Sequence, residues 1–315
     1  MSFFENKVGE PGHESCSGCG LCLLGCPVWR QTHDLRLTPQ GRAKALQHGA
    51  EPDSLQASVA SCTLCGACEP ACPENLPLVD MILKLRSEMP LEREVALAKM
   101  ATAAHAAAPS SGVVLLPGRA LGGDAARLAR ALSLLGAAFA SDDGADISLA
   151  IEAGVSVPGD RLDRFLSALR GARRLIVADG LLLRELRRWL PKVSVTGLGE
   201  ALSRLAAVRA RLRATDLYVI EPRAFHADYQ RLIRHYDVLR VAFGGAMNLD
   251  LQRIAVPTTA SAAQHALGAP SISTAEQARW ILEGRRFERV VVEDASDCAV
   301  FAAETEKPVL HLADL

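Results

Sequence analysis

Short apolar runs alternate with longer amphipathic stretches along the C-terminal two thirds of the chain. The short runs have the length and composition of buried strands, and the longer stretches have the spacing of helices. Strands are expected over residues 113–116, 175–178, 193–195, 217–220, 290–292 and 309–312, with helices that reach residues 135, 190 and 239 and one that covers 275–283. Alternating strands and helices predict an α/β domain with mainly parallel strands.

The predicted α/β domain contains an internal repeat. The pattern R-A-[LF]-x-x-D-x-x-R-L-x-R begins at Arg119 and again at Arg223. Further matches join Ala138-Phe139 to Ala242-Phe243 and residues 175–179 to residues 290–294. Because the spacing is the same in both halves, we expect two duplicated, pseudo-symmetric lobes, over about residues 113–205 and 215–315.

The N-terminal part has a helical pattern instead. Thr38 followed by Pro39 is typical of a helix start, with threonine as the N-cap and proline at the first helical position. Four apolar residues from Leu78 to Met89 recur at helical spacing. The expected organisation is a helical domain over residues 1–90, a helix and linker over 91–112, and the duplicated α/β domain over 113–315.

Composition narrows the class of protein. The 315 residues are 49% hydrophobic and 23% charged, which suits about two packed domains. A net charge of −1 and a pI of about 6.7 argue against a nucleic-acid-binding protein. No stretch has the length and apolarity of a membrane span, and the N-terminus lacks the pattern of a secretory signal. We therefore expect a cytoplasmic protein, and peripheral association with a membrane stays open.

The nine cysteines are the most informative feature of the composition, because eight of them fall into two runs. The first run comprises Cys16, Cys19, Cys22 and Cys26, and the second comprises Cys62, Cys65, Cys68 and Cys72. Both runs follow C-x2-C-x2-C-x3-C-P, the spacing that binds [4Fe–4S] clusters in two-cluster ferredoxins. In a reducing compartment such clusters of cysteines indicate metal ligation or redox chemistry.

In this pattern the fourth cysteine of each run ligates the other cluster. Cluster 1 is therefore expected to take Cys16, Cys19, Cys22 and Cys72, and cluster 2 to take Cys62, Cys65, Cys68 and Cys26. The alternative is a pair of structural zinc sites. Zinc ligands usually come as separated C-x2-C pairs, which these runs match poorly.

Between the cysteine runs lies the segment T-P-Q-G-R, residues 38–42, and a helix carrying Arg86 follows the second run. With these features, residues 16–90 resemble the N-terminal module of the iron–sulfur subunits of glycolate oxidase and lactate-utilisation dehydrogenases. The helical cluster subunit of heterodisulfide reductase is similar. The resemblance implies a hetero-oligomer in which a flavin-containing dehydrogenase subunit oxidises a 2-hydroxy acid or a similar donor. This chain would be a non-catalytic electron-transfer subunit, passing single electrons through two [4Fe–4S] clusters to a further carrier or a quinone.

In that family the C-terminal part carries two cysteine-rich halves, each with a Cys-Cys-Gly motif. The predicted lobes resemble these halves in layout but lack their ligands. Arg119 and Arg223 stand where the halves have cysteines, and residues 242–245 replace the Cys-Cys-Gly of the second half. Only Cys298 remains, near the last cysteine of the family. We therefore expect a degenerate domain that serves as a docking platform.

Two other functions stay open. The α/β domain could reduce a disulfide or a quinone in a pocket that uses Cys298, although a lone cysteine among apolar neighbours is more often a small buried hydrophobe. The chain could also be a scaffold protein stabilised by structural metal.

Overall fold

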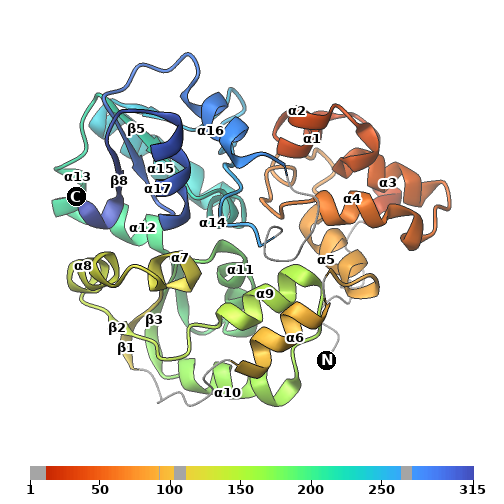
Figure 1. The fold of residues 1–315 in the computed structure, drawn as a ribbon, viewed down its shortest axis with the longest axis horizontal. Helices are drawn as coiled ribbons and strands as arrows, with labels where there is room; N and C mark the ends of the chain where they lie inside the picture. The colour runs from red at the N-terminus through yellow and green to blue at the C-terminus, as the bar shows by residue number, and fades with distance from the viewer. Residues whose placement is uncertain (1–11, 92, 103–110, 264–271) are drawn as a thin grey trace.

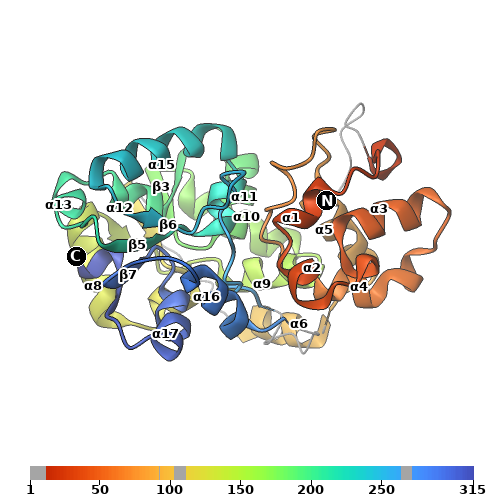
Figure 2. The same ribbon diagram turned by 90° about the horizontal axis from the view of Figure 1, so that it is seen from above.

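The computed structural model describes residues 12–91, 93–102, 111–263 and 272–315. An N-terminal group of helices packs beside a larger part that contains two β-sheets (Figure 1). Figure 2 shows from above that the N-terminal helices lie at one end of the molecule and the sheets at the other. Within the described residues, no helix has the length and apolarity needed to cross a membrane.

Short helices surround the cysteine-bearing loops of the N-terminal part. They are α1 (Leu21–Leu24), α2 (Pro27–Thr32), α3 (Pro39–Gln47), α4 (Gln56–Ser61) and α5 (Leu78–Glu88), with 3-10 turns at His13–Ser15, Leu35–Leu37 and Pro52–Leu55. The predicted helix start is confirmed, because Thr38 accepts a hydrogen bond from the Gly41 N–H at 3.1 Å and Pro39 opens α3. The predicted stripe on α5 is buried at Ile82 and Leu85.

Two four-stranded parallel sheets form the centre of the C-terminal part. The first has the order β2-β1-β3-β4, with β1 Gly112–Leu116, β2 Ala138–Phe139, β3 Ala172–Val177 and β4 Ser194–Gly197. The second has the order β6-β5-β7-β8, with β5 Asp216–Val219, β6 Ala246–Met247, β7 Arg289–Val292 and β8 Val309–His311. The predicted α/β class with parallel strands is therefore confirmed.

Helices connect the parallel strands of each sheet, as parallel pairing requires. The helices of this part are α6 (Arg93–Thr102), which precedes β1, and then α7 (Gly118–Gly122), α8 (Ala125–Leu135), α9 (Ala145–Ala153), α10 (Gly159–Leu169), α11 (Gly180–Trp189), α12 (Leu198–Ser203), α13 (Ala206–Arg209), α14 (Pro222–His226), α15 (Tyr229–Phe243), α16 (Thr274–Leu282) and α17 (Ala295–Glu304), with a 3-10 turn at Leu312–Asp314. The helix expected after residue 90 is α6, which packs against α9 (Figure 1). Most of the linker expected before residue 112 lies outside the described residues.

The structure departs from the predicted repeat at one match. Ala138-Phe139 form β2, whereas Ala242-Phe243 end α15, and the strand that follows that helix begins only at Ala246. The reason is length: α8 has 11 residues and α15 has 15, so the second helix is about one turn longer. The predicted match of residues 175–179 with residues 290–294 agrees with the structure. Asp179 after β3 and Asp294 after β7 are each the N-cap of the next helix.

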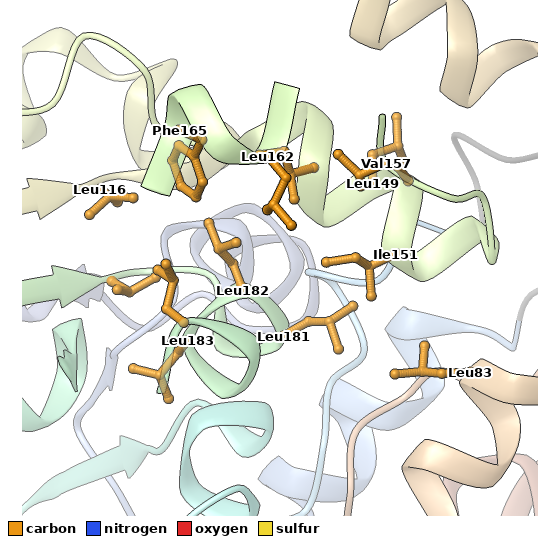
Figure 3. Packing of buried hydrophobic residues seen from close by; sticks show 14 of the residues in the cluster. Leu83, Leu116, Leu149, Ile151, Val157, Leu162, Phe165, Leu181, Leu182 and Leu183 are labelled. Carbon is orange, nitrogen blue, oxygen red and sulfur yellow. The ribbon is translucent and has the colours of Figure 1, made fainter. Parts of the chain in front are cut away.

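One hydrophobic core joins the N-terminal helices to the first sheet. Figure 3 shows Phe165 of α10 above Leu182 of α11, with Ile151 of α9 between them and Leu83 of α5. All four belong to one cluster of buried side chains. Since α5 shares this core with α9 and α11, burial of apolar surface fixes the cysteine region against the first sheet.

Charged side chains add contacts between the N-terminal helices and the helices of both sheets. Arg184 of α11 lies 3.3 Å from Glu69 and 3.0 Å from Asp80. A cation–π contact joins α2 to α16: the guanidinium carbon of Arg30 lies 3.2 Å from the centroid of the Trp280 ring. The N-terminal helices are thus fixed at two separate places.

Candidate iron–sulfur centres

The eight cysteines of the two runs surround two small cavities. The first cavity is lined by Cys16, Cys19, Cys22 and Cys72, and the second by Cys26, Cys62, Cys65 and Cys68. Pro39 and Leu78 line both cavities, so the two are adjacent. The thiols divide in the way that the crossed assignment requires, while ligation of clusters 1 and 2 by these sets stays a prediction.

The donor chemistry of both cavities suits an iron–sulfur cube. Four thiols line each cavity, and thiolates are the ligands that hold [4Fe–4S] clusters. Across the described part of the chain, no group of three or more His, Cys, Asp or Glu side chains is arranged to hold a metal ion. A cube makes a different demand from a single ion, because each of its thiolates binds a different iron.

Left-handed glycines wind the first run tightly. Gly18 and Gly20 have φ angles of 78° and 80°, which glycine adopts without steric cost. Helix α1 begins after Gly20 and carries Cys22. Cys26 then forms the N-cap of α2, with Pro27 at its start. The change of chain direction places Cys26 at the second cavity and the other thiols of its run at the first.

The second run lies against α14. Gly66 has a φ of 73°, and a Cβ added there would stand 3.1 Å from the Cβ of His226. The Nδ1 atom of His226 lies 2.7 Å from the carbonyl oxygen of Cys65. Since a carbonyl only accepts, Nδ1 carries the proton. Burial lowers the pKa of His226 to about 4, so the ring is neutral.

Burial also controls the protonation of the thiols. It raises the pKa of Cys22 and that of Cys65 to about 12. Burial raises the pKa of Cys26 as well, although the N–H groups of Trp29 and Val28 at the start of α2 oppose it. A metal-free thiol of Cys22 or Cys65 is therefore protonated at neutral pH. It becomes a thiolate when a metal centre takes the place of the proton.

Three buried side chains donate hydrogen bonds to backbone carbonyls of the second run. The pairs are Arg86 with Cys62, Arg223 with Thr63, and His226 with Cys65. Sequence patterns did not predict the last two, because Arg223 follows Thr63 by 160 residues and only the folded chain brings them together. The structure therefore adds α14 to the surroundings of the second cavity.

Arg223 stands where the family resemblance places a cysteine ligand. Its Nη1 and Nη2 atoms lie 2.9 and 3.0 Å from the two carboxylate oxygens of Glu152 on α9. Both side chains are buried, and the Ala263 N–H donates to the same carboxylate at 2.7 Å. A bidentate ion pair thus connects α14 to α9, and the hydrogen bond from Arg223 to the Thr63 carbonyl connects α14 to the second cysteine run.

A larger cavity of about 370 Å³ lies where the two sheets face each other. Its lining includes residues 117–121 after β1, 178–180 after β3 and 293–296 after β7, and no cysteine is among the described residues that line it. Cys298 lies on α17 and packs against the core under the second sheet. Burial raises its pKa to about 11.

Replacing Cys298 with serine is expected to leave iron content and turnover of the assembled complex unchanged. The thiol is protonated at neutral pH and packs outside the cavity between the sheets. Iron analysis and a turnover assay with and without Cys298→Ser test this. Lost turnover at full iron content would instead support reduction of a substrate by the α/β domain.

Comparison with known proteins concerns the N-terminal part. Residues 12–76 match the family described as 4Fe-4S dicluster domain. The probable glycolate oxidase iron-sulfur subunit of Bacillus subtilis is 32% identical over 93 residues, covering 26% of this chain and 20% of that protein. Lactate utilization protein B of Macrococcus caseolyticus is 37% identical over 76 residues, 22% of this chain and 16% of the relative.

One of the subunits of the ferredoxin:CoB-CoM heterodisulfide reductase of Methanosarcina mazei is 32% identical over 77 residues, 23% of this chain and 43% of the relative. The chain thus matches less than half the length of each of these relatives. No solved structure matches the chain. The predicted resemblance is confirmed for the cysteine region: residues 12–76 match the 4Fe-4S dicluster domain family, and this region is similar to subunits of oxidoreductases, among them a glycolate oxidase iron-sulfur subunit.

Proposed function

We propose that the chain is the iron–sulfur electron-transfer subunit of an oxidoreductase complex and that it holds two [4Fe–4S] clusters. The observation that carries this proposal is the division of eight thiols into two sets of four around adjacent cavities, within a matched dicluster domain. Adjacency matters because single electrons pass between centres that lie close together. Both cavities share Pro39 and Leu78 in their walls.

The chain's own residues would hold, bury and position the clusters. Cluster 1 would be held by Cys16, Cys19, Cys22 and Cys72, and cluster 2 by Cys26, Cys62, Cys65 and Cys68. A bound cubane supplies reversible one-electron chemistry. Apolar side chains such as Leu64, Val79 and Ile82 line the second cavity and exclude water from it. Arg86, with Arg223 and His226, fixes the backbone of the second run.

The C-terminal part would serve as the docking platform for partner subunits. Its two sheets share the strand order in which the first strand lies between the second and the third. This common topology supports the predicted duplication into lobes of about residues 113–205 and 215–315. The described residues that line the larger cavity include none of the cysteines that the related halves carry. A docking role therefore explains why the C-terminal part is retained better than cluster-based catalysis does.

The names of the relatives suggest the electron donor. A glycolate oxidase and a lactate-utilisation protein are among them, which supports a flavin-containing partner that oxidises a 2-hydroxy acid. The downstream acceptor would be a further carrier or a quinone.

Anaerobic affinity purification of the chain from its native cells tests the partnership. We expect a complex that contains flavin and whose clusters are reduced by glycolate or lactate. The loss of visible absorption on addition of the 2-hydroxy acid reports the reduction. Clusters that stay oxidised with both acids, in a complex without flavin, would contradict the proposed partner.

A further inference from the structure

Two arginines beside the second cavity are buried without a carboxylate partner. Arg42 is 1% exposed and Arg86 is 0% exposed. Among the described residues, their hydrogen bonds go to neutral groups only: Arg42 to the carbonyl of Leu37 and to the carbonyl and hydroxyl of Ser58, and Arg86 to the carbonyls of Val59, Cys62 and Glu152. A buried cation without a counter-charge is strongly destabilising. The protein therefore needs negative charge at this place.

Both arginines lie against the residues that surround the second cavity. Arg42 lines the cavity itself, and its Nε atom is buried without a hydrogen-bond partner in the described part of the chain. Arg86 donates to the carbonyl of Cys62, one of the four cysteines there. The two cations and the thiols thus share one buried environment.

Neighbouring charges do not cancel the two arginines. Arg223 is paired with the carboxylate of Glu152, and Glu69 is paired with Arg184. Two positive charges therefore remain at the second cavity. The first cavity also has a cation nearby, since Lys44 donates to the carbonyl of Cys16 at 2.7 Å, but its described lining adds the carboxylate of Glu74.

We propose that Arg42 and Arg86 are the counter-charges of the cluster held at Cys26, Cys62, Cys65 and Cys68, and that they raise its reduction potential above the value that this buried site would otherwise give. The inference rests on the proposed function. An oxidised cubane with four thiolates is a dianion, so the two guanidinium groups balance it. Reduction adds a third negative charge, which a positive environment stabilises more than it stabilises the oxidised form. Both arginines act on the cluster through their positive charge, and neither is a ligand of its irons.

Redox titration followed by EPR, on the iron-loaded chain, tests the proposal with charge-removing and charge-keeping variants. Arg42→Gln and Arg86→Gln remove the charge, whereas Arg42→Lys and Arg86→Lys keep it. Arg36→Gln is the matched control, because that side chain is exposed and pairs with Asp34. In each glutamine variant we expect one of the two reduction steps to become less favourable by about tenfold or more, which is about 59 mV for a one-electron couple.

The lysine variants and Arg36→Gln are expected to keep both potentials close to those of the natural protein. A glutamine variant that loses half of its iron, while the matching lysine variant retains it, also supports the counter-charge. Equal shifts in the glutamine and lysine variants, or equal losses of iron, would overturn the proposal, because hydrogen-bond geometry would then be the cause. A natural chain that binds no iron would overturn the proposed function instead.

Discussion

Replacing Cys72 with alanine is expected to remove the cluster of the first cysteine run, although Cys72 belongs to the second run. In the structure Cys72 lines the cavity of Cys16, Cys19 and Cys22. A cube that loses one of four thiolates from a half-buried cavity loses a bond that water replaces poorly. About half of the iron should therefore be lost, and the cluster at Cys62, Cys65 and Cys68 should remain.

A single variant does not tell which cluster is lost, but pairs of variants do. Cys19→Ser is combined in turn with Cys72→Ala and with Cys26→Ala. With crossed ligation, the pair that contains Cys72→Ala removes the same cluster twice and keeps about four irons per chain. The pair that contains Cys26→Ala damages both clusters and leaves almost none. If the pair with Cys72→Ala lost almost all iron and the pair with Cys26→Ala kept about four irons, the crossed assignment would be wrong.

Replacing Arg223 with alanine is expected to lower the free energy of unfolding by about 3–5 kcal/mol. The change leaves the carboxylate of Glu152 buried without its bidentate partner, and it removes the hydrogen bond to the carbonyl of Thr63. The ion pair connects α14 to α9 across the two sheets, so no solvent can replace the guanidinium there. Urea unfolding of the iron-loaded chain measures the loss.

The matched control for this variant is Arg164→Ala. Arg164 also pairs with a carboxylate, that of Asp160 at 2.8 Å, but both side chains are largely exposed. Exposed pairs of this kind contribute little, so the unfolding midpoint of the control should stay unchanged. Equal midpoints for Arg223→Ala and Arg164→Ala would show that the buried pair contributes no more than a surface pair does.

Local patterns predicted the parts of the fold that local chemistry determines. The Thr38-Pro39 start of α3 and the apolar stripe of α5 were predicted correctly, because capping and helical periodicity depend on neighbours in sequence. Strands β2 and β6 have two residues each, too few to show a period, and were missed. The equivalence of Ala138-Phe139 with Ala242-Phe243 was wrong, since nothing in the pattern revealed the extra turn of α15.

The candidate site was likewise predictable only where it depends on residues that are close in the sequence. Spacing alone predicts the eight cysteines as ligands, because the thiolates of one loop must reach irons of one cube. The donors on α14 that hold the second run could not be predicted, as Arg223 and His226 reach it only through the packing of distant segments. The burial of Arg42 and Arg86 was equally hidden, because an arginine on a helix normally lies at the surface.

Iron and acid-labile sulfide per chain, measured on anaerobically purified protein together with an EPR spectrum after dithionite reduction, test the central claim most directly. Two cubanes predict about eight irons and eight sulfides, with the signals of two interacting reduced clusters. More than eight irons would show that the α/β domain holds a further cofactor. Zinc without iron, in a colourless protein, would contradict the electron-transfer account.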